Sequence, residues 1–198
     1  MNLRGLYAIT PELLEGNELQ RRVERALEGG IAALQYRRKG SAQLEEARTL
    51  ARMCRARGAL FIVNDNIALS ADADGVHLGK DDGDLAAARA KLQGKVLGAS
   101  CYDSLDAARA AARAGADYVA FGSVFASATK PAAVRAPMAL FRDAKSLGVP
   151  LVAIGGITLE NAPALLAAGA DALAVVSDLF DAPDVAARAR AYGKLFAR

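Results

Sequence analysis

Short apolar runs alternate with longer segments of helical period along the whole chain. The short runs are rich in Val, Ile, Leu and Ala, which is typical of strands covered on both faces. Strands are predicted at 6–9, 32–35, 60–63, 75–78, 96–99, 118–122, 151–154 and 172–176. Helices are predicted between them at 18–28, 42–57, 85–91, 104–114, 137–147, 159–168 and 183–196, with a turn or two at 67–71.

Glycines mark the junctions where a predicted helix ends and the next strand begins. Gly29 and Gly30, Gly75, Gly115 and Gly169 all occupy such junctions, and glycine readily adopts the left-handed turn that stops a helix. Repeated βα units within 198 residues favour an α/β fold, a single-domain (β/α)8 TIM barrel spanning residues 1–198. An open doubly wound sheet is the alternative.

Composition narrows the classes of protein that fit. No apolar run approaches the roughly twenty residues of a membrane span, and the first ten residues lack the layout of a signal peptide. We therefore expect a cytoplasmic protein with no membrane partner. The net charge is only +3, aromatic residues are 6% and Trp is absent, so no nucleic-acid partner is expected. Cys54 and Cys101 form no metal-binding or disulfide pattern and are expected to be reduced thiols.

The end of the second predicted strand carries cations. Gln35, Arg37 and Lys39 alternate, so their side chains should point to the same side of the strand. Adjacent cations with an amide suit a diphosphate group, because Lys neutralises charge and Arg supplies a forked donor. A solvated basic loop is the other interpretation of this segment.

Carboxylates follow the next two strands. Asp65 lies in an Asn-Asp-Asn sequence after the strand at 60–63, and Asp81 and Asp82 follow Gly79. Magnesium in proteins is commonly held by one or two carboxylates together with substrate phosphates. Helix capping is the alternative for each aspartate taken singly. Carboxylates at two strand ends of one barrel favour a Mg²⁺ site.

Small and hydroxyl residues follow the later strands. Ser127, Thr129 and Lys130 could surround an anion, although the glycine spacing of a Walker motif is missing. Gly155 and Gly156 with Ser177 correspond to the phosphate site that TIM barrels build after their seventh and eighth strands.

The sequence gives weaker support for a catalytic role of the single histidine and of Cys101. His77 lies within a predicted strand and lacks the partners of a catalytic triad, so a hydrogen-bonded core or rim histidine is favoured over a general base. Cys101 lies at a strand end, where filling a small rim position is favoured over a nucleophilic role.

These segments, in this order and spacing, resemble the thiamine phosphate synthase family over essentially the whole chain. The matching segments are 35–39 (QYRRK), 64–65, 74–82, 98–100, 122–130 (GSVFASATK), 154–157 (IGGI) and 175–177. The resemblance implies a TIM barrel enzyme that joins hydroxymethylpyrimidine diphosphate to thiazole phosphate and releases diphosphate with Mg²⁺.

The resemblance also implies a role for each matching residue. The pyrimidine diphosphate would be held by Gln35, Arg37, Lys39, Asn64, Ser100 and Lys130. Asp65 and Asp82 would bind the magnesium ion. The thiazole phosphate would be bound by Ser127, Thr129, Gly156, Val176 and Ser177. The substrate-binding set also includes Tyr36, Arg38 and Ala128. Arg37, Lys39 and Lys130 would be catalytic, because they take up charge on the departing diphosphate.

Three positions depart from the family pattern, and other functions remain as alternatives. Ser127 occupies a position where the family usually has Thr, and Lys80 one where it usually has Gln or Glu. Ser123 replaces the usual Pro in the loop after the sixth strand. A thiazole tautomerase would not need the cationic residues at 35–39 or the two magnesium carboxylates, and a non-catalytic phosphate sensor would have lost Asp65, Asp82 or Lys130.

Aldolase-type chemistry through a Schiff base at Lys39 or Lys130 is a further alternative. It is disfavoured because a Schiff-base lysine is usually desolvated rather than set among cations and phosphates. The sequence does not decide between a monomer and a homo-oligomer.

Overall fold

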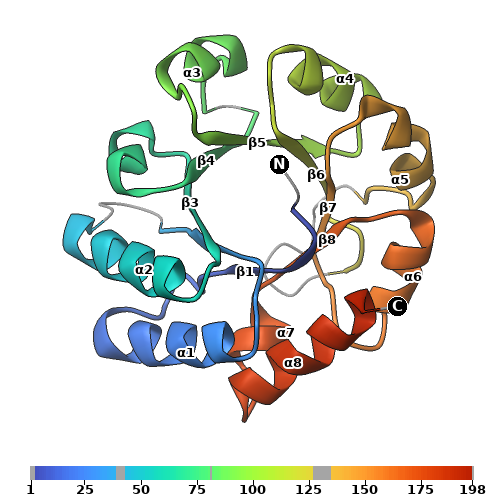
Figure 1. The fold of residues 1–198 in the computed structure, drawn as a ribbon. Coiled ribbons are helices and arrows are strands. Elements are labelled where there is room, and N and C mark those ends of the chain that lie inside the picture. Colours follow the sequence, from blue (N-terminus) through green and yellow to red (C-terminus); the bar gives the residue numbers. More distant parts are fainter. Residues whose placement is uncertain (1–2, 39–42, 81, 127–134, 198) are drawn as a thin grey trace.

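The computed structural model describes residues 3–38, 43–80, 82–126 and 135–197, and it contains a closed barrel of parallel strands surrounded by helices (Figure 1). The strands pair in chain order, and β1 closes the barrel on β8. They are β1 (Gly5–Ile9), β2 (Ala33–Tyr36), β3 (Leu60–Asn64), β4 (Gly75–Leu78), β5 (Val96–Tyr102), β6 (Tyr118–Phe121), β7 (Leu151–Ile154) and β8 (Ala172–Val175). The predicted TIM barrel is confirmed.

The helices lie outside the barrel and connect successive strands. They are α1 (Gly16–Glu28), α2 (Leu44–Ala56), α3 (Leu85–Lys91), α4 (Leu105–Arg113), α5 (Ala139–Asp143), α6 (Ala162–Ala168), α7 (Ser177–Phe180) and α8 (Val185–Phe196), with 3₁₀ turns η1 (Ile67–Asp72) and η2 (Ala144–Leu147). Side chains cap several of them: Asp84, Ser104 and Asp184 each accept a hydrogen bond from the backbone N–H three residues later.

Three helical segments differ from the prediction. The helix expected at 137–147 is α5 followed by η2. α6 begins only at Ala162, because Asn161 Oδ1 accepts from Thr158 N (2.9 Å) and holds the preceding residues in a turn. The four-residue α7 was not predicted, since it is too short to show a helical period.

The core has two layers separated by the barrel wall. Inside the barrel, Tyr7, Ile62, Tyr118 and Val152 pack together with smaller side chains. Outside it, the opposite faces of the strands pack against the helices, as with Leu34. Successive side chains of a strand alternate between these layers, so the odd or even position of a residue decides whether it can reach a site inside the barrel.

Gly75 and Gly98 are needed for packing. Gly75 lies within β4 and does not end a helix, which corrects the prediction made for it; a side chain there would meet the Val96 carbonyl oxygen at 2.3 Å. At Gly98, a Cβ atom would lie 2.1 Å from Cζ of Tyr118. The Tyr118 ring can therefore cross the barrel interior only because residue 98 has no side chain.

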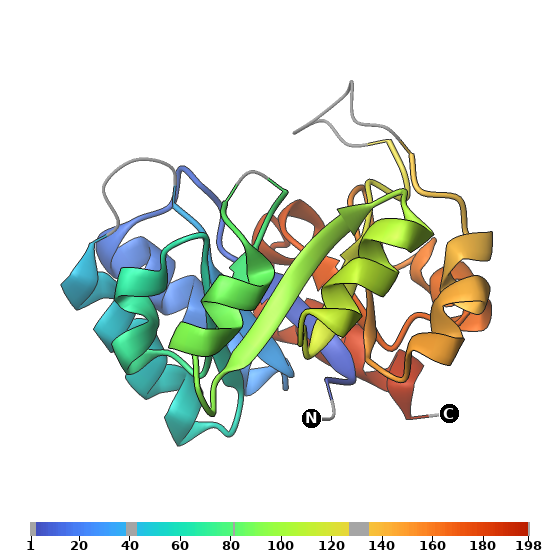
Figure 2. The same cartoon turned by 90° about the horizontal axis from the view of Figure 1, so that it is seen from above.

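The two ends of the barrel are built differently. Leu3, at 2% exposure, closes the amino-terminal end, and Arg4 donates to the Phe196 carbonyl oxygen (3.2 Å) nearby. The loops that follow the strands gather at the opposite end, away from both marked chain ends (Figure 2). No helix among the described residues has the length and hydrophobicity to cross a membrane.

Candidate active site

Two carboxylates face each other at the open end of the barrel. Asp65 follows β3 with φ 59° and donates its backbone N–H to the His77 carbonyl oxygen (2.9 Å). Asp82 follows β4, and its Oδ2 accepts from Gly79 N (2.8 Å). Partial burial, then the hydrogen bond and negative charge of Asp82, raise the pKa of Asp65 to about 6. The pair is thus a concentration of negative charge that a cation would relieve.

Cationic and amide groups lie beside this acidic pair. The positive charge of Arg37 and a hydrogen bond from Asn64 Nδ2 both favour ionised Asp65 and oppose the rise in its pKa. Arg37 is held by its backbone, since its N–H donates to Thr10 Oγ1 (2.9 Å) and its carbonyl accepts from the same hydroxyl (3.1 Å). Its side chain is 28% exposed, with Nη1 at 3.8 Å from Glu12. Lys39 lies outside the described residues.

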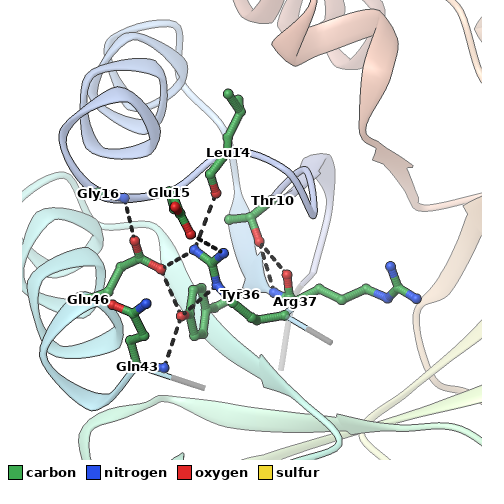
Figure 3. Close-up of polar contacts among 9 residues, drawn as sticks. Thr10, Leu14, Glu15, Gly16, Tyr36, Arg37, Gln43 and Glu46 are labelled. Atoms are coloured by element: carbon green, nitrogen blue, oxygen red, sulfur yellow. Dashed lines mark hydrogen bonds and ion pairs between the residues drawn. The ribbon is translucent and has the colours of Figure 1, made fainter. Parts of the chain in front are cut away.

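The side chains of Tyr36 and Arg38 point away from the barrel mouth. Tyr36 packs in the outer layer and donates to Glu46 Oε1 (2.8 Å). Arg38 donates to the same carboxylate (2.6 Å). In Figure 3, Tyr36 and Glu46 lie together, whereas the Arg37 side chain extends in the other direction. This orientation follows from strand alternation, which gives Tyr36 and Arg38 the face opposite to Gln35 and Arg37, so only their backbone groups could contact a substrate at the mouth.

A chain of buried polar side chains crosses the barrel below the acidic pair. Gln35 Nε2 donates to the Tyr7 hydroxyl (2.9 Å), which bonds the Tyr118 hydroxyl (2.8 Å). His77 Nδ1 lies 3.0 Å from the Tyr118 hydroxyl, and His77 Nε2 lies 2.8 Å from Ser100 Oγ. Burial lowers the pKa of His77 to about 4, so the imidazole is neutral near pH 7. The prediction of a hydrogen-bonded core histidine is confirmed.

The ends of β7 and β8 bring the predicted phosphate-binding residues to the same end of the barrel. Gly156 has φ 63°, and a Cβ atom there would lie 2.3 Å from the Ala126 carbonyl oxygen. Val176 is half-buried and caps α7, and Ser177 is exposed in its first turn. Ser127, Ala128, Thr129 and Lys130 lie outside the described residues.

The residues present fit a magnesium ion. Asp65 and Asp82 offer opposed carboxylates at an exposed rim, and hard oxygen ligands suit Mg²⁺. The part of the chain that the structure describes holds no group of three or more potential metal-ligating His, Cys, Asp or Glu side chains. An ion held by these two carboxylates would take its other oxygen ligands from water and from substrate phosphates.

Comparison with known proteins gives the family. A family model described as thiamine monophosphate synthase matches residues 6–179. The chain belongs to the thiamine monophosphate synthase family.

Relatives of that family match nearly the whole length of the chain. The thiamine-phosphate synthases of Aromatoleum aromaticum and Chromobacterium violaceum are 59% and 56% identical to it, each over 98% of this chain and 97% of their own. The solved thiamine phosphate pyrophosphorylase from Pyrococcus furiosus is 35% identical, with a TM-score of 0.85 over 99% of this chain and 96% of its own. The protein is accordingly a transferase of thiamine biosynthesis.

One departure from the thiamine phosphate synthase pattern has a structural answer. Ser123, in place of the usual Pro, donates its hydroxyl to the Phe125 carbonyl oxygen (2.7 Å), which constrains the loop in another way. Lys80 is exposed beside Asp82. Ser127, the third departure, lies outside the described residues.

Some residues of the site were missed by sequence reasoning. Tyr7 and Tyr118 lie within apolar strands, where nothing distinguishes a hydrogen-bonding tyrosine from a packing one. Thr10 gives a weak signal in the sequence, because it is a polar residue that directly follows a predicted strand, like the other candidates. Cys101 is 1% exposed, and burial raises the pKa of its thiol to about 12, which agrees with the packing role favoured from sequence.

Proposed function

We propose that this thiamine-phosphate synthase joins hydroxymethylpyrimidine diphosphate to thiazole phosphate with Mg²⁺, as one catalytic domain in the cytoplasm. The observation that carries the proposal is the opposed Asp65–Asp82 pair beside Arg37. A bound magnesium ion would supply charge neutralisation to the leaving diphosphate. Such an arrangement suits a substrate with several negative charges and an ion between protein and phosphate.

The reaction needs charge stabilisation more than proton transfer. The bond between the pyrimidine methylene carbon and the diphosphate oxygen breaks, its electrons leave with diphosphate, and the thiazole nitrogen forms the new carbon–nitrogen bond. Arg37, with Lys39 and Lys130 as predicted partners, would stabilise the departing charge, an effect of several kcal/mol. No general base is needed, in keeping with a neutral His77.

The two substrates would occupy different sides of the barrel mouth. Gln35, Asn64 and Ser100 come from β2, β3 and β5 and would take the pyrimidine. Gly156, Val176 and Ser177 follow β7 and β8 and would take the thiazole phosphate through backbone N–H groups.

The test is detection of thiamine phosphate by mass spectrometry from purified protein, both substrates and Mg²⁺. We expect Asp82→Asn to lower turnover by about two orders of magnitude or more, because one acidic ligand is lost. Asp84→Asn is the matched control: Asp84 caps α3, and its amide oxygen can still accept from Ala87 N, so activity should persist. Full activity of Asp82→Asn, or undiminished activity in excess EDTA, would remove Mg²⁺ from the proposal.

A further inference from the structure

The buried polar chain inside the barrel connects two of the predicted pyrimidine-binding residues. Its members come from five strands: Gln35 on β2, Tyr7 on β1, Tyr118 on β6, His77 on β4 and Ser100 on β5. Tyr7 and Tyr118 are at most 1% exposed and His77 is 7% exposed. Water therefore has little access to the middle of the chain, and its members must satisfy one another.

The direction of the hydrogen bonds along this chain follows from counting protons. Gln35 Nε2 donates to Tyr7, so the Tyr7 proton goes to Tyr118, its one other partner among the described side chains. The Tyr118 proton must then go to His77 Nδ1. A neutral imidazole carries one proton, which is therefore on Nε2 and is donated to Ser100 Oγ.

Both ends of the chain are left with a defined hydrogen-bonding character. Gln35 Nε2 is already used by Tyr7, and none of the described hydrogen bonds uses Gln35 Oε1, so the amide oxygen is the group of this side chain left to meet a ligand. Ser100 Oγ already accepts from His77, and no group among the described residues accepts its own proton. The barrel mouth thus presents an acceptor on β2 and a donor on β5.

We propose that the Tyr7–Tyr118–His77 relay sets Gln35 as an acceptor and Ser100 as a donor, and so selects an amino-substituted nitrogen heterocycle over its oxo analogue. An aminopyrimidine offers an N–H donor to Gln35 and a ring-nitrogen acceptor to Ser100. The oxo analogue sets a carbonyl oxygen against Gln35 Oε1, where two acceptors repel. This inference rests on the proposed function for its substrate. Tyr7, Tyr118 and His77 are positioning residues.

The hydrogen-bond direction can be measured without activity, because the chain has a single histidine. Long-range ¹H–¹⁵N correlation on the full chain labelled in its histidine should show the Nε2–H tautomer at neutral pH. The Nδ1–H tautomer would mean that the whole chain runs the other way, and it would overturn the proposal.

Selectivity is measured by calorimetry with hydroxymethylpyrimidine diphosphate and its analogue carrying oxygen in place of the amino group. A site built to pair a polar group rejects an unpaired analogue strongly, and we expect the amino compound to bind about 100-fold more tightly. Affinities within threefold of each other would overturn the selection.

Tyr118→Phe tests the relay itself. Without this hydroxyl the histidine should show a mixture of tautomers, and the preference for the amino compound should fall about tenfold. Tyr192→Phe is the control, because that tyrosine is equally buried but bonds Asp178 (2.7 Å) outside the barrel; it should leave tautomer and preference unchanged. An unchanged tautomer and preference in Tyr118→Phe would overturn the relay.

Failure of the proposed function has a different signature. If the wild-type protein binds the amino compound selectively and shows the Nε2–H tautomer but forms no thiamine phosphate, the selection stands and the proposed reaction is wrong. If product forms but the tautomer is Nδ1–H, the reaction stands and the relay is wrong.

Discussion

Residue 98 shows how one missing side chain makes room for chemistry. The Tyr118 ring fills the space in front of Gly98, and its hydroxyl is the central member of the polar chain. Tyr7, Ile62 and Val152, at other inward strand positions, carry side chains that pack together. The absence of a Cβ atom is therefore a requirement of the tyrosine on the neighbouring strand β6 and not of the local backbone conformation.

Gly98→Ala should consequently destabilise the protein. Its Cβ atom would lie 2.1 Å from Tyr118 Cζ, and overpacking of this kind costs about 1–3 kcal/mol. Thermal or urea unfolding measures the change in the free energy of unfolding. Gly193→Ala in α8 is the control: nothing lies within 4 Å of the added atom, and Ala in a helix is favoured over Gly by about 0.5–1 kcal/mol. A neutral Gly98→Ala would show that the ring moves freely.

At the scale of elements, the carboxylate of Glu46 joins three segments of chain. It accepts from Gly16 N (2.7 Å) at the start of α1, from Tyr36 at the end of β2 and from Arg38 beyond it (Figure 3). Gln43 N donates weakly to the same Tyr36 hydroxyl (3.4 Å). Arg38 and Gln43 flank the segment that carries Lys39, so this cluster anchors both sides of it.

Glu46→Gln should therefore destabilise the fold by about 1–3 kcal/mol, because it removes the charged acceptor of three hydrogen bonds and leaves Arg38 with the longer contact to Glu15 (3.4 Å). Glu45→Gln is the control, since Glu45 is 79% exposed where it pairs with Arg48; a surface pair of this kind contributes well under about 1 kcal/mol. Equal losses in urea unfolding for the two variants would contradict the anchoring role.

The Glu46→Gln variant should also change how the stability of the protein depends on pH. Burial opposes ionisation of Glu46, but hydrogen bonds from Arg38, Gly16 and Tyr36 outweigh it and lower its pKa. A lowered carboxyl pKa stabilises the fold above the ordinary value and loses that stabilisation as pH falls. The wild-type protein should thus lose stability on acidification more steeply than Glu46→Gln.

The short helix α7 permits a clean test of the two-substrate arrangement. Ser177→Ala removes one exposed hydroxyl from its first turn and should raise the KM for thiazole phosphate about tenfold, leaving the KM for the pyrimidine substrate unchanged. Substituting Gly156 would be less informative, because its side chain would strike the Ala126 carbonyl oxygen whatever is bound. Equal effects on both KM values would show that the two phosphate sites are assigned wrongly.

Viewed as a whole molecule, the barrel could be predicted from sequence because its periodic signal is long and regular. Each strand is an apolar run, and polar residues such as Asp65 follow directly where the strand ends. Alternation along 35–38 was also sufficient to separate the side chains of Gln35 and Arg37 from those of Tyr36 and Arg38.

What could not be predicted depends on contacts between distant segments. The bond between the Tyr7 and Tyr118 hydroxyls joins residues 111 positions apart. The Arg38–Glu46 pair needs the packing of α2 against the end of β2, for which the charges of a helix surface give no signal. Hydrophobic periodicity reports which face of an element is buried, and it is silent about which polar partners meet there.

Because most of the tyrosines are buried, the absorbance of their phenolate forms reports whether the barrel is folded. The chain has five tyrosines and no tryptophan; Tyr7, Tyr36, Tyr118 and Tyr192 are at most 2% exposed, whereas Tyr102 is 45% exposed. Burial raises the pKa of each of those four phenols. The folded state therefore resists phenolate formation, and its stability falls as pH rises above the ordinary tyrosine pKa of about 10. After a jump to alkaline pH, most of the phenolate absorbance should appear only at the rate at which the barrel opens, and immediate ionisation of all the tyrosines would contradict this packing.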